Sequence, residues 1–339
     1  MLKFHVTCNI KDAPFSSSSI IVNGLNSGAK NLNLYDENGI NVHYSHLCES
    51  HGKERDVFIS LYELNFPQFI LNNAQNKPII GSSRDNMFFI LNGGYNSQKC
   101  GFVTLGIDSK LWKLQEKRFL KHKFVFLSYC DSNTRCGFLH LIHAFGKAFK
   151  NSKDIVLFLK DRYPTDKFIS VVKELANFYN INIIHHIDNI DNWKDQIDIY
   201  ASADAHIFVN HSSTNALTVL QGLSCGLLTA CMLYSGPRDY CSEQNVIPIP
   251  FEHTLVSSEK LTSLEEYGLR NYLFKSGYTT QPFWAEPKLD SLSQILIEIK
   301  ENKNKLNYLI TNGRKMAEEL TWECAALNMN YEAEKLLNN

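Results

Sequence analysis

The chain has 339 residues, of which 44% are hydrophobic, and this length and composition predict a folded protein with two domains. Its 34 basic and 35 acidic residues give a net charge of -1, which excludes the strong positive field of a general nucleic-acid-binding or membrane-coating protein. Nine cysteines without a CxxC pair argue against a closed disulfide set, so we expect reduced thiols in a cytoplasmic protein.

The N-terminal residues MLKFHVTCNI have no apolar stretch of the kind found in signal peptides, and no cleavage site follows them. No apolar run approaches the roughly 18 residues that a membrane-spanning helix needs. We therefore expect no targeting segment and no membrane span.

Short runs of β-branched and aromatic residues predict strands, and segments of helical length separate them. In the first third of the chain these runs are LKFHVTC, NLNLYDE, RDVFISLY, KPIIGSS and GFVTLGI. A second series consists of KFVFLSYC, DIVLFLKD, INIIHHI, AHIFVN and LLTACMLY. Strands that alternate with helices predict a parallel sheet with crossover helices, and two series predict two sheets.

A charged segment over residues 111–123 separates the two series and marks the expected domain boundary. Apolar residues at helical spacing predict helices at 137–150, 168–180, 290–310 and 323–337, with no strand after Pro287. We expect a first Rossmann-like domain over residues 1–115, a second over 116–310, and a C-terminal helix over 311–339 that packs back towards the first.

In open parallel sheets, ligands bind at the carboxyl ends of the strands, where loops lead into helix N-termini. The loops expected at these ends are 12–19, 129–137, 160–166 and 210–216. Arg135 precedes a helix, and its guanidinium suits a diphosphate; the alternative is a solvated loop arginine. Lys160 ends a buried strand, where it either faces a cleft or extends to the surface. The serine run Ser16–Ser19 either binds a sugar or phosphate or caps a helix.

Several familiar sites have no support in the sequence. HYSHLCESH contains His43, His46, Cys48 and His51, but it matches no spacing with a known metal-binding mechanism, so no metal site is predicted. His185 and His186 are adjacent in a strand and point to opposite faces, so they cannot share a ligand. The chain contains no GxSxG, P-loop or GxGxxG motif, which gives hydrolase, nucleoside triphosphatase and dinucleotide-binding functions no support.

A series of motifs in a fixed order carries more information than any one of them. In FVFLSYCDSNTRCGFLHLIHAF a strand, a loop with Arg135 and Gly137, and a helix follow each other. Tyr200, Ala203 and Asp204 then lead into a strand. The further segments are QGLSCG, YSGPRDYCSEQNVIPIP, FWAEP, LTWECAA and, earlier, VTLGIDSKLWK. This order resembles glycosyltransferase family 4 (glycosyl transferase group 1), whose members are retaining enzymes of the GT-B architecture.

The resemblance implies an α/β fold of two Rossmann-like domains that face a central cleft, with C-terminal helices crossing back. It implies that the second domain binds a nucleotide-sugar, with GDP, UDP or ADP as the nucleotide, and that the first binds a glycan, polysaccharide or glycoprotein acceptor. It also implies no cofactor and no metal. No nucleic-acid partner is expected, and peripheral membrane contact is left open.

The chain departs from the family at three charged positions. The family's Arg-Lys-Gly becomes Arg135-Cys136-Gly137, and its two glutamates align with Ser213 and Gln221. Gln221 would then meet the ribose, since an amide can both accept and donate to a diol. Ser213 would take the position next to the sugar, with Thr214 and Asn215 nearby.

The remaining candidates complete the predicted site. Arg135, Lys160, Thr214 and Asn215 would bind the diphosphate, and Ser212, Ser235 and Gly236 would supply loop groups near the sugar. Glu63 and Ser213 are the catalytic candidates; the alternative for Glu63 is a carboxylate at a helix N-terminus.

Three functions stay open. The first is a retaining, metal-independent glycosyltransferase. The second is a catalytically reduced protein of the same architecture that binds a nucleotide or glycan or serves as a partner subunit, because the usual lysine and both glutamates are missing. A nucleotide-sugar epimerase is the third, although no carboxylate and histidine set for it can be assembled from the sequence.

Overall fold

The structure is a computed structural model, and it describes residues 2–7, 17–45, 56–60, 77–113, 119–130, 132, 134–188, 190, 192–256 and 283–338. Contacts divide the chain into two compact units. The first unit contains Met1–Leu111, Ser213–Leu217 and Ala317–Asn339, and the second contains Trp112–Ser212 and Thr218–Met316. Within the described ranges, no helix is long and apolar enough to cross a membrane.

The first unit is built on a five-stranded sheet in the order β1-β2-β3-β4-β5, and every pairing in it is parallel. Its strands are β1 (Phe4–Thr7), β2 (Ile40–Ser45), β3 (Val57–Ser60), β4 (Ile79–Gly81) and β5 (Cys100–Phe102). The described helices of this unit are α1 (Ser17–Asn31), α3 (Arg84–Asn92) and α11 (Trp322–Asn338), with a short 3-10 helix at Ser97–Lys99. Val42, Ile59 and Ile80 are fully buried, as expected for a parallel sheet covered on both faces.

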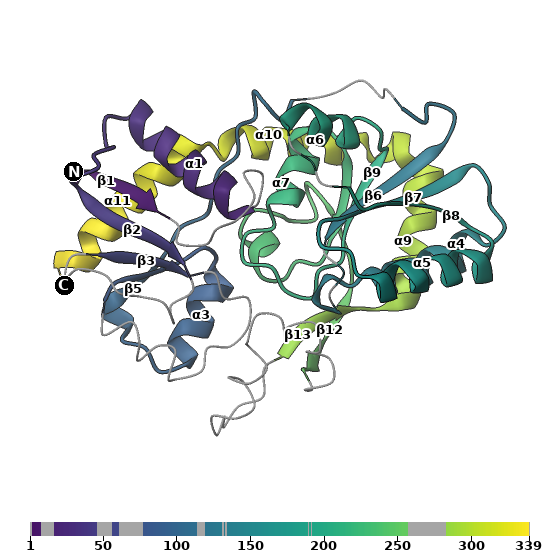
Figure 1. Ribbon diagram of the computed structural model, residues 1–339, viewed down its shortest axis with the longest axis horizontal. Coiled ribbons are helices and arrows are strands. Elements are labelled where there is room, and N and C mark those ends of the chain that lie inside the picture. Colours follow the sequence, from purple (N-terminus) through teal and green to yellow (C-terminus); the bar gives the residue numbers. More distant parts are fainter. Residues whose placement is uncertain are drawn as a thin grey trace. The chain divides into compact units, whose positions relative to one another are not determined.

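Helix α11 packs against α1, although about 290 residues of chain separate them (Figure 1). The approach is close because glycines face Trp322. A Cβ atom on Gly24 would lie 2.2 Å from the indole ring, and one on Gly28 would lie 2.2 Å from the carbonyl oxygen of Trp322. The main chain of Leu320 also accepts a hydrogen bond from the amide of Ile107, at 2.8 Å. The end of the chain therefore completes the core of the first unit.

The second unit contains a six-stranded sheet in the order β11-β10-β9-β6-β7-β8, again with parallel pairings throughout. Its strands are β6 (Phe124–Cys130), β7 (Ile155–Asp161), β8 (Asn182–His186), β9 (Ala205–Phe208), β10 (Leu228–Cys231) and β11 (Ile247–Pro248). A separate antiparallel hairpin pairs β12 (Phe251–Leu255) with β13 (Phe283–Pro287). All residues of β7, β9 and β10 are buried.

The helices that connect these strands are α4 (Phe138–Phe149), α5 (Asp166–Tyr179), α6 (Trp193–Tyr200) and α7 (Leu217–Ser224). They are followed by α9 (Leu289–Asn302) and α10 (Asn307–Glu319), with short 3-10 helices at Thr134–Cys136, Gly236–Asp239 and Lys303–Leu306. Helix α4 packs against both α5 and α9 (Figure 1). Its apolar stripe includes Leu141, Phe145 and Phe149, and the ring of Phe145 lies 5.9 Å from that of Phe126 on β6.

Most predicted strands are confirmed, but two differences have physical reasons. Residues 31–37 were expected to form a strand; instead Asn31 ends α1, and Tyr35 makes only an isolated bridge to Phe4. Strand β2, INVHYS, was not predicted: its apolar and polar residues alternate, as in a strand buried on one side only, whereas the other strands were predicted from longer apolar runs. The expected helix at 290–310 is broken into α9, a 3-10 turn and the start of α10.

The predicted domain limits, 1–115, 116–310 and 311–339, refer to parts that fold independently. Contacts within the folded chain do not measure independent folding, so these limits stay a prediction.

Candidate functional site

The strand order of the second sheet reverses between β6 and β9. From β6 the chain proceeds through β7 to β8 at one edge, whereas from β9 it proceeds through β10 to β11 at the other. Strands β6 and β9 are neighbours, with Phe126 opposite Ala205 and Leu127 opposite His206. Such a switch point leaves a crevice at the carboxyl ends of the two strands, and ligands of open α/β sheets bind there. The loops after β6 and β9 therefore define the candidate site.

Arg135 joins these two loops. Its guanidinium Nη1 donates to the carbonyl oxygen of Ser212 at 2.7 Å, and its own carbonyl accepts from the amide of His211 at 2.8 Å. Ser212 is completely buried. The structure thus brings together two of the predicted site residues, Arg135 and Ser212, at the switch point.

Gly137 is required at the end of the first loop. Its φ is 69°, in the left-handed region that favours glycine, and it precedes the first residue of α4. A Cβ atom at this position would lie 2.3 Å from the carbonyl oxygen of Val209. Glycine is therefore needed at position 137 for two reasons, one of backbone conformation and one of space.

The predicted residues Ser213, Thr214 and Asn215 belong to the first unit. Ser213 Oγ accepts a hydrogen bond from the amide of Ala216 at 3.2 Å, and Asn215 Nδ2 donates to the hydroxyl of Tyr44 at 3.0 Å. Thr214 is buried. Ala216 has a φ of 45°, an uncommon value for alanine, so this segment holds strain directly before α7.

Gln221, predicted to meet the ribose, is buried in α7 with an exposure of 5%. The hydroxyl of Tyr200 donates to Gln221 Oε1 at 2.9 Å and also lies 3.3 Å from the carbonyl oxygen of Thr218. Burial raises the pKa of Tyr200 well above its ordinary value, so its hydroxyl keeps the proton that it donates. The ring of Tyr129 stacks on Tyr200 at 5.2 Å. Gln221 therefore fixes α7 to the core through its amide oxygen.

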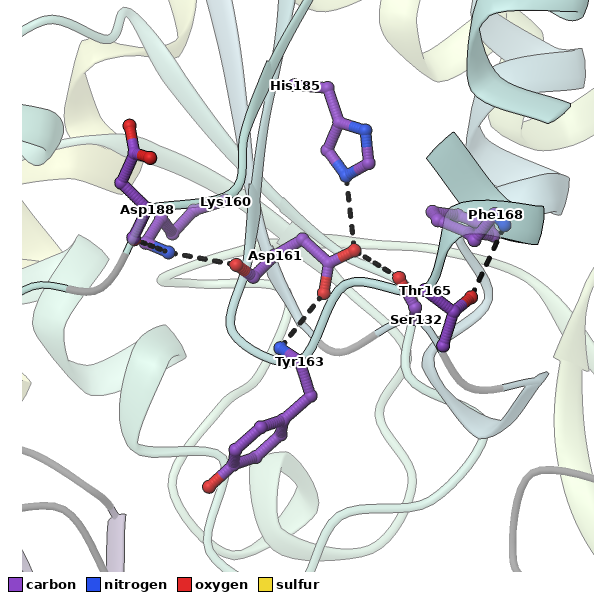
Figure 2. Close-up of polar contacts among 8 residues, drawn as sticks. All are labelled: Ser132, Lys160, Asp161, Tyr163, Thr165, Phe168, His185 and Asp188. Atoms are coloured by element: carbon purple, nitrogen blue, oxygen red, sulfur yellow. Dashed lines mark hydrogen bonds and ion pairs between the residues drawn. The ribbon is translucent and has the colours of Figure 1, made fainter. Parts of the chain in front are cut away.

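Lys160 is the penultimate residue of β7 and is buried, and Figure 2 shows its contacts. Its Nζ donates to the carbonyl oxygens of Asp161 and Asp188, each at 2.9 Å. Burial, and then the positive charge of Lys160, lower the pKa of His186 on the neighbouring strand. The ammonium group is thus held by main-chain oxygens at the ends of β7 and β8, and its predicted role towards a diphosphate stays a prediction.

Asp161 is a polar centre that the sequence analysis did not identify. Its Oδ2 accepts from the hydroxyl of Ser132 and lies 3.1 Å from His185 Nε2, while its Oδ1 accepts from the amide of Tyr163 at 3.2 Å (Figure 2). The Asp161 side chain is fully buried. The aspartate links the loops that follow β6 and β7 to a histidine of β8, so it orders the loop that contains Arg135.

The loop after β10 contains the last two predicted residues, Ser235 and Gly236. Ser235 has φ 56° and ψ -137°, a combination that residues other than glycine rarely adopt, and it is buried. Gly236 begins a 3-10 helix and is also buried. Backbone strain of this kind occurs most often at functional sites, which makes this loop a further part of the candidate site.

Other predictions fall elsewhere. Glu63 lies outside the described residues, as do His46, Cys48 and His51. His43 contacts Asp56 at 2.9 Å and Asn41 at 2.8 Å. In the part of the chain that the structure describes, no three His, Cys, Asp or Glu side chains form a group that suits a metal ion.

Comparisons with known proteins identify the fold. No protein-family model matches the chain, and no curated protein matches it. Among solved structures, Anabaena HepE in complex with UDP and glucose superposes with a TM-score of 0.68 at 10% identity, covering 98% of this chain and 100% of that one. A glycosyltransferase from Rickettsia africae superposes with a TM-score of 0.63 at 13% identity, covering 97% of this chain and 84% of that one. The pneumococcal O-GlcNAc transferase GtfA, in complex with UDP and GlcNAc, gives 0.56 at 13% identity, covering 93% and 60%.

Likeness at these identities concerns the fold alone. It confirms the predicted fold class, an α/β protein with two Rossmann-like domains of the GT-B type.

Proposed function

We propose that the protein transfers a sugar from a nucleotide-sugar to a carbohydrate acceptor. The observation that carries this proposal is the switch point between β6 and β9, where Arg135 connects the two loops at the carboxyl ends of the strands. The chain shares its fold with proteins whose structures contain UDP with glucose, UDP-glucose, or UDP with GlcNAc. We therefore propose UDP as the nucleotide, in preference to GDP and ADP.

The proposed reaction breaks the bond between the anomeric carbon of the sugar and an oxygen of the diphosphate. An acceptor hydroxyl oxygen forms the new bond to that carbon and passes its proton to the departing diphosphate oxygen, and the nucleoside diphosphate leaves. Negative charge on the leaving oxygen must be stabilised, and the guanidinium of Arg135 is suited to this. As the resemblance implies, we propose that the transfer retains the anomeric configuration and needs no metal.

A binding experiment tests the nucleotide. UDP, GDP and ADP are added separately to the purified protein, and thermal unfolding is followed. A nucleotide that binds the folded state at about a hundredfold excess over its dissociation constant stabilises the protein by about 2.7 kcal/mol, which raises the melting temperature measurably. UDP should give the largest shift. If no nucleotide changes the melting temperature, the proposal is wrong.

The same experiment with Arg135→Ala tests the residue. We expect the UDP shift to be lost, because a bidentate cation for the diphosphate is removed. Arg162→Ala is the matched control, since Arg162 is an exposed arginine of the same unit that lies over the ring of Tyr163 at 4.7 Å. A full UDP shift in Arg135→Ala would assign this arginine a structural role only.

Gln221 provides a separate test of the ribose contact. Gln221→Ala should weaken UDP binding about tenfold, the effect of one good hydrogen bond. Tyr200→Phe removes the hydroxyl that donates to Gln221 Oε1 and lies near the carbonyl oxygen of Thr218, but it leaves the Gln221 amide in place, so its UDP affinity should fall less. Unchanged affinity in Gln221→Ala would show that this side chain serves packing alone. Calorimetric titration with UDP measures both.

A second function, nucleotide-sugar binding without turnover, is favoured by one observation. Lys160 and Gln221 are both buried and bonded to groups of the protein, and Ser213 and Gln221 stand where family 4 has glutamates. Incubation with UDP-glucose separates the two functions. UDP release, with or without an acceptor, supports the transferase, whereas tight binding with no release over hours supports the second function.

A further inference from the structure

The hairpin formed by β12 and β13 presents aromatic side chains on one face. Antiparallel pairing places Phe251 opposite Pro287, His253 opposite Ala285 and Leu255 opposite Phe283. Because alternate residues of a strand point to the same side, these side chains share one face of the hairpin. Three of them, with Tyr234 from the loop after β10, form what we name the ring cluster: Tyr234, Phe251, His253 and Phe283.

The rings of this cluster contact one another. The centroid of His253 lies 5.5 Å from Tyr234, 5.6 Å from Phe251 and 5.4 Å from Phe283, and that of Tyr234 lies 5.7 Å from Phe251. His253 is exposed, Phe251 and Phe283 are half-buried, and the adjoining Leu255 is 59% exposed. Aromatic rings that are clustered and partly exposed form a surface suited to a ligand, whereas scattered single rings need no explanation.

The hairpin is attached to the candidate site at its base. The amide of Ala285 donates to the carbonyl oxygen of His211 at 3.0 Å, and the ring of the buried Trp284 lies 4.8 Å from that of His211. Tyr234 directly precedes the strained Ser235. The ring cluster therefore extends from the two loops that contain Ser212 and Ser235.

The side chains of the ring cluster indicate which chemical class of ligand it can bind. Its accessible members, Phe251, His253 and Phe283, offer apolar ring surface and an imidazole, whereas Tyr234 is buried and packs against Phe251 and His253. The cluster contains no lysine or arginine that would bind phosphate. A neutral pyranose matches this surface, because one of its faces consists of C–H groups and its edge carries hydroxyls that an imidazole can bond. Single-stranded nucleic acids also stack on aromatic rings, but they require a positively charged groove for the backbone.

We propose that the ring cluster binds a neutral pyranose unit of the acceptor by stacking, next to the loops where the donor binds. This inference rests on the proposed glycosyl transfer and adds to it a location and a chemical class for the acceptor. The location is in the second unit, and it differs from the resemblance, which implies that the first domain binds the acceptor. The cluster contributes to binding of the acceptor and not to binding of the nucleotide.

The experiment compares His253→Ala and Phe283→Ala with the natural sequence. Phe178→Ala is the matched control, because Phe178 is an aromatic residue of the same unit, on α5, with 71% exposure and no place in the cluster. The probes are neutral oligosaccharides of glucose, galactose and N-acetylglucosamine, printed as an array and then titrated singly. Circular dichroism and urea unfolding check that each variant is folded.

We expect at least one oligosaccharide to bind the natural protein, and each cluster variant to bind it about tenfold more weakly, as for the loss of one stacked ring. The UDP-induced rise in melting temperature should be unchanged in both variants. Equal oligosaccharide affinity in the cluster variants overturns the inference, and so does the absence of any bound oligosaccharide. If UDP shifts the melting temperature in either of those cases, the proposed function stands without this acceptor surface; if UDP has no effect, the proposed function itself fails.

Discussion

At the scale of single residues, Gly137 combines a left-handed backbone with a close approach to the carbonyl oxygen of Val209. Gly137→Ala must adopt an unfavourable φ and also displace that oxygen. We expect a loss of about 2 to 4 kcal/mol in the free energy of unfolding, the range of strained and overpacked sites. Urea unfolding followed by circular dichroism measures it.

Gly137→Asn separates the two causes. Asparagine tolerates the left-handed region better than alanine does, but its Cβ atom occupies the same space. If the clash dominates, both variants lose similar stability; if backbone strain dominates, the asparagine variant recovers part of it. A loss below about 0.5 kcal/mol in the free energy of unfolding of both variants would contradict the strain and the close contact at Gly137.

His206 is a fully buried histidine on β9, and no described residue forms a hydrogen bond with either of its ring nitrogens. Burial lowers its pKa from 6.5 to about 3. Between these two values the unfolded chain binds a proton that the folded protein does not. Stability is therefore lost as the pH falls from 6.5 towards 3, with a slope of up to about 1.4 kcal/mol per pH unit from this group.

His206→Leu removes the imidazole that takes up a proton in the unfolded chain. The free energy of unfolding should therefore depend less on pH below 6.5. Urea unfolding at pH 7.5, 6.0 and 5.0 measures the free energy of unfolding of both proteins. Both proteins have the same carboxylates, so the contribution of these groups cancels in the difference between the two free energies. Above pH 7 the variant should show no pH-dependent difference from the natural protein. Parallel pH profiles below 6.5 would mean that His206 is protonated in the folded state.

From the sequence, candidate site residues could be predicted only where they lie close together along the chain. Arg135 and Gly137 could be found because a strand, a loop and a helix follow one another directly. The contact between Asp161 and His185 depends on the pairing of β7 with β8, and the bond from Tyr200 to Gln221 joins two helices. No local pattern specifies either distance, so these partners could not be named from the sequence.

At the scale of elements, Asp161 connects the end of β6, the end of β7 and strand β8. Asp161→Asn keeps the shape but replaces a buried charged acceptor with an amide. We expect it to lower the free energy of unfolding by about 2 to 3 kcal/mol, the size of hydrogen bonds to charged groups. Urea unfolding measures the loss.

Asp154→Asn is the control for that substitution. Asp154 lies 3.1 Å from Lys123, and its side chain is 87% exposed, so removing this surface pair should have little effect on stability. Similar losses in the two variants would show that the hydrogen bonds of Asp161 do not order the three strands.

Element types were predictable from the sequence, but their arrangement was not. The apolar residues at the start of β7, IVLFL, predicted a buried parallel strand, because a strand that is covered on both faces has mostly apolar side chains. The placement of β6 beside β9 depends on contacts between segments far apart in the chain, and so does the pairing of β12 with β13. The switch point therefore emerged only from the structure.

At the scale of the whole molecule, 34 basic and 35 acidic residues nearly cancel at neutral pH. Proteins without net charge repel one another least, so solubility should be lowest near pH 7 and rise on both sides. Precipitation by polyethylene glycol at pH 6, 7 and 8.5 measures this. A steady change in one direction across that range would contradict the prediction.

The position of Trp322 against Gly24 and Gly28 also bears on the order of events during synthesis. The core of the first unit includes the last helix of the chain, so its N-terminal strands and α1 leave the ribosome long before α11 exists to cover them. Since the sheet of the second unit is complete by Pro248, that sheet can form first. The first unit then completes its folding after that sheet. In a nascent chain that is halted before Trp322, the surface of α1 around Gly24 and Gly28 should be exposed to chaperones and proteases.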